Sequence, residues 1–211
     1  MAILGYLVTN FSANRTAIHL TTLHLSSIFK FHIWLEITTP IKDQTGISKT
    51  VFSHVSKLHG LLNNWVKLRD KGTKFCKVIS SVKLHECEND YYPHQLKPIM
   101  DNLVEILESL KDIVDGVAIL NDQLKALAQL QPTSQPVIFT WSATQISKTV
   151  QNIYKSLLKE YRLKQVVTEN VAHCRDEFLI ETYVSSWELD PHFNASDEAF
   201  LFAEFGLVGV T

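Results

Sequence analysis

Hydrophobic residues recur at intervals of three and four through most of this chain of 211 residues. The clearest pattern lies between residues 96 and 131, where steps of four and three alternate over four heptad repeats. This pattern predicts a long amphipathic helix that packs against other helices. The residues of this heptad seam are Ile99, Leu103, Ile106, Leu110, Ile113, Val117, Leu120, Leu124 and Leu127.

Two roles are open for the heptad seam. It can form the internal core of a helical bundle, or it can form an interface with another chain. A helix that extends from residue 96 to 131 is long for the interior of so small a protein. We therefore assign the nine seam residues as a hypothetical partner interface and keep the core as the alternative.

A second long helix is predicted over residues 46–71. Its apolar stripe is followed by the sequence RDKG, in which Gly72 suits a left-handed C-terminal cap. A separate, shorter helical piece is then expected over residues 74–84. The stripe consists of Ile47, Val51, Val55, Leu58, Leu62 and Trp65.

A third long helix is predicted over residues 142–173. Ser142 and Gln145 have the spacing of a capping box, and Trp141 and Ile146 have the spacing of a hydrophobic staple. The apolar face of this helix continues to its end, and Lys164 is its one polar interruption.

Two shorter helices are expected near the C-terminus, over residues 176–189 and 196–205. Asp176 and Ser196 suit the N-cap position of each. The aromatic sequence AFLFAEF in the last helix either serves as a docking motif or folds back on the bundle. Strand signals are scarce, so the predicted fold class is all-α: an elongated antiparallel helical bundle or coiled coil.

The first 44 residues are predicted to lie outside the single helical domain of residues 45–211. The first forty are rich in Ser, Thr and His, and Glu36 is their one acidic residue. This composition is compatible with a disordered extension, or with residues included because the start codon was placed too far upstream. It is also compatible with an organelle transit peptide that would direct the chain to mitochondria, or with a segment that packs on the body. No apolar run is long enough to span a bilayer.

The composition excludes several functional classes. The net charge is −2, which argues against nucleic acid as the main partner, because such a protein needs a basic surface, and leaves a local basic patch as an alternative. The three cysteines form no CxxC pair, which indicates reduced thiols. Nucleotide-binding, metalloprotease and serine-hydrolase motifs are absent from the sequence.

Two local groups deserve consideration as chemical sites. His85, Cys87 and His94 provide three donors at a spacing that matches no zinc module, so we predict a polar loop, with no metal and no cofactor. His173, Cys174 and Asp176 are the candidate residues of an alternative function, a small helical enzyme or ligand-binding protein. Adjacent helical residues point about 100° apart, so we favour a joint between helices and assign no catalytic residue.

Residues 136–191 carry an unusual pattern: TW before a long helix, then Y, S, W and P after it. This stretch resembles the cyclin-dependent kinase 2-interacting protein family in one ungapped register, and the first predicted helix adds Trp65. The resemblance covers roughly residues 47–205, and Ser142 stands where the family commonly has proline. The matched positions include Trp65, Pro136, Thr140, Trp141, Thr144, Glu160, Lys164, Tyr183, Trp187 and Pro191.

The resemblance implies a non-enzymatic helical adaptor in the nucleus. It implies roles in the cell cycle, DNA replication, DNA repair and the DNA damage response, through cyclin-dependent and origin-firing kinases and a checkpoint adaptor. It also implies an assembly with AAA ATPases and a small helical co-subunit that acts in ribosome biogenesis. A hetero-oligomer formed through the coiled coil is expected, without direct contact to nucleic acid or membrane.

Overall fold

The computed structural model describes residues 46–86, 92–131, 134–193 and 195–207. Their helices are α2 (Ile47–Ser81), α3 (Leu96–Leu130), α4 (Ala143–Asn170), α5 (Glu177–Glu188) and α6 (Ala195–Glu204). Two short strands, β1 (Pro136–Ile138) and β2 (Trp141–Ser142), precede α4. The prediction of an all-α bundle with three long and two short helices is confirmed for this part of the chain. The extension at residues 1–44 lies outside the described residues.

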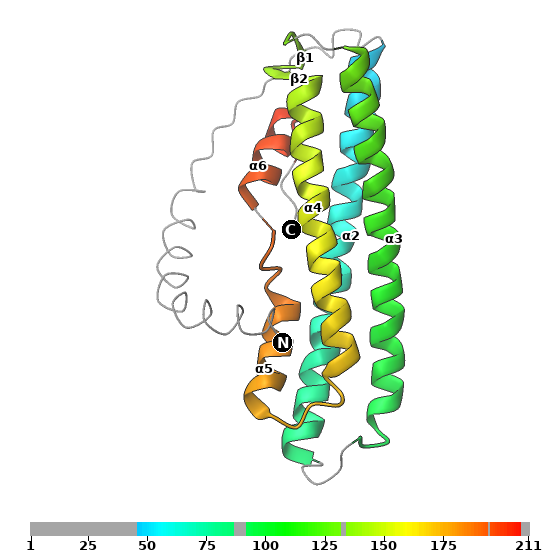
Figure 1. Ribbon diagram of the computed structural model, residues 1–211, viewed down its shortest axis with the longest axis vertical. Coiled ribbons are helices and arrows are strands. Elements are labelled where there is room, and N and C mark those ends of the chain that lie inside the picture. The colour runs from blue at the N-terminus through cyan, green and yellow to red at the C-terminus, as the bar shows by residue number, and fades with distance from the viewer. Residues whose placement is uncertain (1–45, 87–91, 132–133, 194, 208–211) are drawn as a thin grey trace. The chain divides into compact units, whose positions relative to one another are not determined.

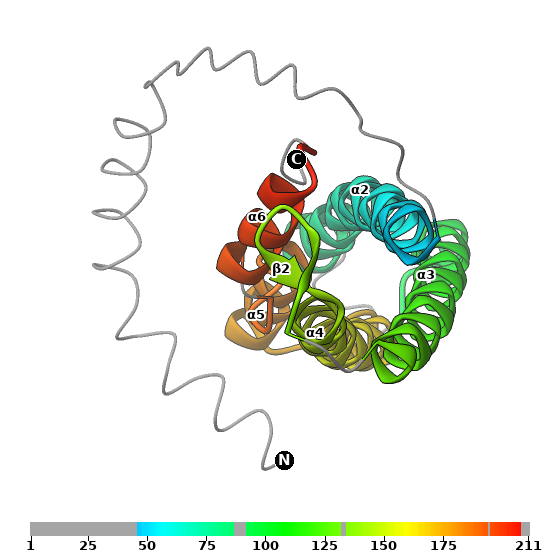
Figure 2. The ribbon, with the colours of Figure 1, turned by 90° about the horizontal axis from the view of Figure 1, so that it is seen from above.

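The three long helices lie side by side and alternate in direction (Figure 1). Helix α3 packs against both α2 and α4, which explains why its hydrophobic stripe is wide. Helices α5 and α6 follow one another along the side where α2 and α4 face away from α3 (Figure 2). The fourth position of this bundle is therefore occupied by two short helices in series.

The heptad seam of α3 lies inside this bundle. Its seven central residues are buried, from Leu103 at 0% exposed to Ile113 at 6%, and only Ile99 and Leu127 at the two ends are partly exposed. Burial on both sides by α2 and α4 places the seam in the chain's own core. A partner would reach these side chains only if α3 separated from its neighbours, so they are not an available interface in this conformation.

Helix α2 does not end near Gly72, contrary to the sequence prediction. It continues to Ser81 and runs into a π-helical turn, Val82–Glu86, so no separate helical piece exists at 74–84. The glycine is required for a different reason: a Cβ atom at Gly72 would overlap the indole ring of Trp187. Gly72 is therefore a point of close helix contact and not a C-terminal cap.

The segment before α4 forms a small antiparallel hairpin that the sequence pattern did not predict. Its strands have three and two residues, which is too short for hydrophobic alternation to be visible. The capping box at its end is confirmed: the Gln145 N–H donates to Ser142 Oγ at 3.3 Å, and the Ser142 N–H donates to Gln145 Oε1 at 2.9 Å. Helix α4 ends at Asn170, three residues before the predicted end.

The C-terminal helices pack back on the bundle. Asp176 caps α5 as predicted, because its carboxylate accepts from the Leu179 N–H at 2.8 Å. Helix α6 begins at Ala195, so Ser196 lies inside it and is not its N-cap. Leu201 and Phe202 are fully buried, which supports the fold-back alternative for AFLFAEF.

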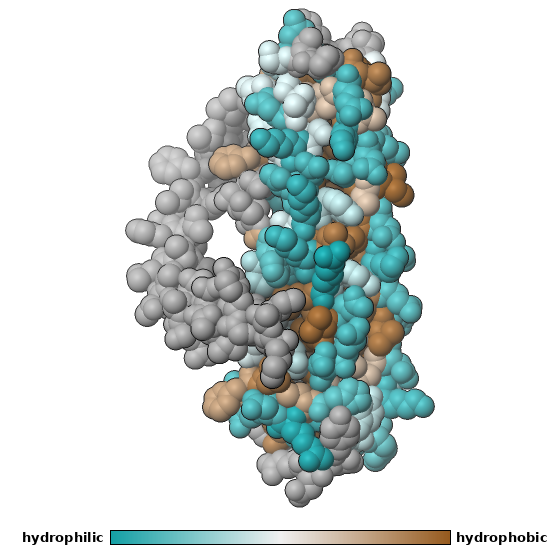
Figure 3. All heavy atoms as spheres, in the orientation of Figure 1, coloured by the Kyte–Doolittle hydropathy of each residue, from teal (hydrophilic) through white to brown (hydrophobic). Residues whose placement is uncertain are grey.

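One face of the described helices is mainly polar. In the face shown in Figure 3, hydrophilic residues dominate, and hydrophobic residues occur in small separate groups. No helix among the described residues combines the length and hydrophobicity needed to cross a bilayer.

Candidate functional site: a buried charge cluster

Lys164 is the centre of a buried charge cluster in the core of the bundle. Its side chain has no exposed surface, although it lies on the otherwise apolar face of α4. The ammonium group donates to Asp190 Oδ1 and lies 3.6 Å from Oε2 of Glu160, which is one helical turn earlier. A buried charge costs several kcal/mol of solvation, so these two carboxylates are needed to keep Lys164 in the core.

Asp190 connects three parts of the chain through one carboxylate. Besides Lys164 on α4, it accepts hydrogen bonds from Trp65 Nε1 at 3.2 Å and from an Arg69 Nη at 3.0 Å, both on α2. The residue follows α5 and has a positive φ of 41°, a conformation that aspartate tolerates better than most residues. The end of α5 is thereby fixed against both α2 and α4.

Two tryptophans enclose the ammonium group. Lys164 Nζ lies 5.6 Å from the ring centroid of Trp65 and 5.8 Å from that of Trp187, within the range of a cation–π interaction. The Trp187 indole N–H donates to the Arg69 carbonyl at 3.0 Å, and the absent side chain of Gly72 makes room for its ring. The aromatic rings thus exclude water from the cluster while their N–H groups remain hydrogen-bonded.

Glu160 has a separate set of contacts with the segment after α5. Its Oε1 accepts from the backbone N–H of His192 and lies 2.9 Å from Nδ1 of the same residue. Burial raises the pKa of Glu160 above its ordinary value, although Lys164 and the His192 N–H favour the charged form. The carboxylate is therefore retained at a net electrostatic cost to the folded state.

The buried thiol of Cys76 does not add chemistry to the cluster. Burial raises its pKa to about 12, and the nearby Lys164 charge only partly opposes this. A thiol with this pKa is protonated at neutral pH and is not a nucleophile. Because all the charged groups at the centre are paired and enclosed, this cluster can fix helix positions but cannot admit a substrate.

The positions of the family resemblance separate into two regions of the bundle. Trp65, Glu160, Lys164 and Trp187 form the cluster itself, with Tyr183 buried nearby on α5 and Pro191 adjacent to Asp190. Asp190 and Arg69 were not singled out from the sequence. The signal that could have found Asp190 is Lys164 itself, because a lysine on an apolar helix face requires an acidic partner.

The remaining resemblance positions lie at the hairpin, except Thr144, which is in the first turn of α4. The backbone N–H groups of Thr140 and Trp141 both donate to Glu204 Oε1 of α6, and the Thr140 hydroxyl donates to Oε2 at 3.1 Å. Pro136 is exposed in β1, and Trp141 is half-buried. One carboxylate therefore attaches the hairpin to α6.

The residues of the alternative enzyme hypothesis are not assembled into a catalytic group. The Cys174 thiol lies 3.6 Å from the backbone oxygen of Asp176, whose carboxylate is occupied in capping α5. The His173 ring packs against Tyr92, with centroids 5.3 Å apart. The Asp176 carboxylate is therefore not positioned to orient a base for the Cys174 thiol.

Metal binding finds no support in the described residues, where no group of three or more His, Cys, Asp and Glu side chains could hold an ion. Cys87 of the HECENDYYPH loop lies outside the described residues, and of His85 only the backbone is described. The predicted absence of a metal in that loop remains a prediction.

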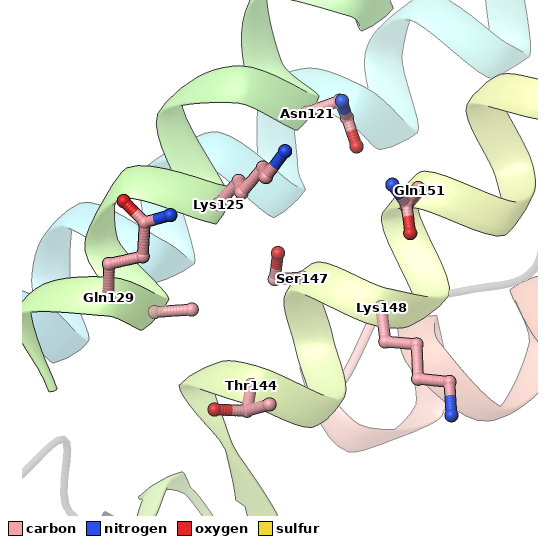
Figure 4. A pocket seen from close by; sticks show the side chains of 8 residues that line it. Asn121, Lys125, Gln129, Thr144, Ser147, Lys148 and Gln151 are labelled. Carbon is pink, nitrogen blue, oxygen red and sulfur yellow. The ribbon is translucent and has the colours of Figure 1, made fainter. Parts of the chain in front are cut away.

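Two surface grooves flank α3. One, of about 380 Å³, lies between α3 and α4, with Asn121, Lys125, Ser147 and Gln151 arranged around it (Figure 4). Thr144 lies at its edge in the first turn of α4. The other, of about 690 Å³, lies between α2 and α3. Both are lined by amides, lysines and aliphatic or small residues.

Comparison with known proteins finds the family that the sequence resembles. The cyclin-dependent kinase 2-interacting protein of Bos taurus is 23% identical over 189 residues, which cover 76% of this chain and 89% of that protein. The Mus musculus protein of the same name is 25% identical over 78% of this chain and 91% of its own length. The Homo sapiens protein of the same name is 22% identical over 79% of this chain and 92% of its own length. No protein-family model matches the chain.

Proposed function

We propose, from the premise that this chain is a distant relative of the cyclin-dependent kinase 2-interacting proteins, that it is a non-enzymatic helical adaptor that binds a cyclin-dependent kinase. The relatives carry that interaction in their name. Their alignment with this chain extends over most of both proteins, so the proposal concerns the whole bundle.

The observation that supports an adaptor most directly is the role of the family-like positions. Trp65, Lys164 and Trp187 are enclosed in the buried charge cluster, and they fix helices instead of lining a cavity. These three residues therefore maintain the relative placement of α2, α4 and α5. A rigid helical surface is the requirement of a protein that binds other proteins.

The finer roles rest on the resemblance alone. We propose that the chain acts in the nucleus, in DNA replication, the DNA damage response and DNA repair, through cyclin-dependent and origin-firing kinases and a checkpoint adaptor. We also propose association with AAA ATPases and a small helical co-subunit in ribosome maturation. These contacts would form a hetero-oligomer that involves neither direct nucleic acid binding nor a membrane.

Purified components provide the test of kinase binding. The full chain, immobilised at its N-terminus, is exposed to recombinant cyclin-dependent kinase 2 with and without its cyclin, and binding is followed by interferometry. We expect saturable binding with a Kd of roughly micromolar or tighter, about −8 kcal/mol. An unrelated protein kinase serves as the control. Equal binding of both kinases, or binding of neither, would reject the proposed function.

A further inference from the structure

The larger groove, between α2 and α3, has the geometry of a helix-binding site. Its lining residues on α2 include positions 57, 60, 61, 64 and 67, and those on α3 are positions 116, 119, 120 and 123. Both sets follow the spacing of three and four that defines one face of a helix. The groove therefore lies between one face of α2 and one face of α3.

Two glycines line this groove. A Cβ atom at Gly60 would meet no other atom within 4 Å, so this position faces open space. A Cβ atom at Gly116 would lie 3.2 Å from Leu61 Cδ1, so this glycine lets the two helices approach at the floor. Glycine within a helix costs about 1 kcal/mol relative to alanine. Unlike Gly72, Gly60 has no close neighbour among the described residues that would explain this cost.

The lining of the groove combines glycines and aliphatic side chains with the amides Asn63, Asn64 and Gln123, and its charged members are positive. Leu120 is buried in the floor, and Ile119 is 59% exposed at the rim. Lys57 and Lys67 are its charged lining residues, and neither forms an ion pair with a described residue. Two acids on the same helices are paired elsewhere: Asp70 with Arg69 at 2.8 Å, and Asp115 with Lys111 at 2.6 Å.

We propose that this groove binds an acidic amphipathic helix of a partner protein. Lys57 and Lys67 are ten residues apart on α2, which corresponds to about 15 Å along the helix axis at 1.5 Å per residue. The partner helix therefore carries acidic residues about ten positions apart, with small and apolar residues between them that face Gly60 and Ile119. A helix laid between two helices packs its side-chain ridges into their groove and leaves its own backbone hydrogen bonds intact.

Charge decides between this occupant and its alternatives. A basic helix would be repelled by both lysines, and a second copy of this chain would have to present two lysines to two lysines in an isologous contact. The inference rests on the proposed adaptor function, because it assigns the surface through which a protein partner is held.

Two variants test the groove without disturbing the core. Gly60→Gln places a side chain in open space and replaces a helix-destabilising residue, so it should block the groove while the thermal midpoint stays the same or rises. Lys57→Glu combined with Lys67→Glu reverses both charges of the groove. The matched control is Lys155→Glu combined with Lys159→Glu, which makes the same charge change at exposed positions of α4.

The readout is site-specific photo-crosslinking. A benzophenone side chain replaces Ile119 in the full chain, which is incubated with nuclear extract, and the crosslinked peptides are sequenced by mass spectrometry. We expect peptides from helical segments with acids about ten positions apart. Their yield should fall about tenfold or more in both groove variants, equivalent to a loss of 1.4 kcal/mol or more of binding free energy, and stay unchanged in the α4 control.

Other outcomes reject the proposal. These are the absence of a crosslink, a crosslink to a second copy of the chain, a crosslink to a segment without acidic residues, or equal yields in the groove and control variants. Binding of the purified kinase is measured separately with the same variants. If the wild-type chain binds the kinase but gives no groove crosslink, this inference is overturned and the proposed function stands. If the wild-type chain does not bind the kinase, the proposed function itself is overturned.

Discussion

The heptad seam of α3 and the buried charge cluster around Lys164 hold the same bundle together by different physical means. The seam consists of aliphatic side chains that contact α2 and α4 and are supplied by consecutive helical turns. The cluster consists of charged and aromatic side chains from α2, α4, α5 and the segment after α5. The seam can be read from spacing, whereas the cluster exists only once the chain has folded.

The seam and the cluster differ mainly in how strictly each defines the register of the helices. Aliphatic side chains in a heptad repeat can exchange partners when a helix slides by one repeat, so a seam alone leaves the register weakly defined. Asp190 receives hydrogen bonds from Trp65, Arg69 and Lys164, and a slide of one turn would break all three. We therefore infer that the seam provides most of the stability and that the cluster defines the register.

The largest effect is expected when Lys164, the centre of the cluster, loses its nearest counter-charge. Asp190→Asn keeps a residue that tolerates the positive φ but removes the closest counter-charge of Lys164. We expect the free energy of unfolding in urea to fall by about 3–5 kcal/mol, as for other broken buried ion pairs. Asp70→Asn, the exposed partner of Arg69, is the control and should cost below about 0.5 kcal/mol. Similar losses for both would contradict the central role of Asp190.

An apolar truncation in the seam should also be costly but should leave the register intact. Leu110 is fully buried, so Leu110→Ala should lower the free energy of unfolding by about 2–5 kcal/mol. The tryptophan fluorescence spectrum of the folded variant should match that of the wild type, because the indole hydrogen bonds of Trp65 and Trp187 do not involve Leu110. A shifted spectrum in Leu110→Ala would show that the seam, too, sets the register.

The two glycines of α2 should respond in opposite directions to the same substitution. Gly72→Ala places a methyl group against the Trp187 ring and should destabilise the fold by about 1–3 kcal/mol, despite the better helix propensity of alanine. Gly60→Ala faces open space and should stabilise it by about 0.5–1 kcal/mol. Thermal unfolding followed by circular dichroism measures both, and stabilisation by Gly72→Ala would refute the close-contact role.

The smallest effect is expected at Glu160, and it depends on pH. Burial raises the pKa of Glu160 above the ordinary 4.5. Protonated Glu160 therefore favours the fold below pH 4.5, and this contribution is lost as the pH rises through the raised pKa. Glu160→Gln removes this loss. The free energy of unfolding of the variant minus that of the wild type should therefore increase from pH 4 to pH 7. Glu169→Gln, at an exposed position of α4, should show no such change. A pH-independent difference for Glu160→Gln would argue against a raised pKa.

The parts of the fold that depend on neighbouring residues were predictable from the sequence. The helices of the bundle follow from spacings of three and four, and both the Ser142–Gln145 capping box and the Asp176 cap lie within four residues of the groups they satisfy. Helix ends without such caps were predicted less well. The C-terminus of α2 is the clearest example, because a helical glycine suits a cap and a close contact equally.

The candidate site was largely unpredictable because its contacts are distant in sequence. Asp190 precedes a proline in ELDP, and this context predicts only the end of a helix. Nothing local indicates that its carboxylate meets Trp65, which lies 125 residues earlier. Lys164 was recognisable as a polar interruption, but the choice of its partner among 22 acidic residues required the fold.

The sequence separation of the cluster also has a consequence for folding kinetics. The hairpin of α2 and α3 can form from nearby segments, whereas the contact of Trp65 with Asp190 must close a loop of 125 residues. We expect this contact to form after the folding transition state. Asp190→Asn should then accelerate unfolding in stopped-flow measurements and leave the folding rate nearly unchanged. The last contact to form would thus determine how long the folded chain survives before it opens.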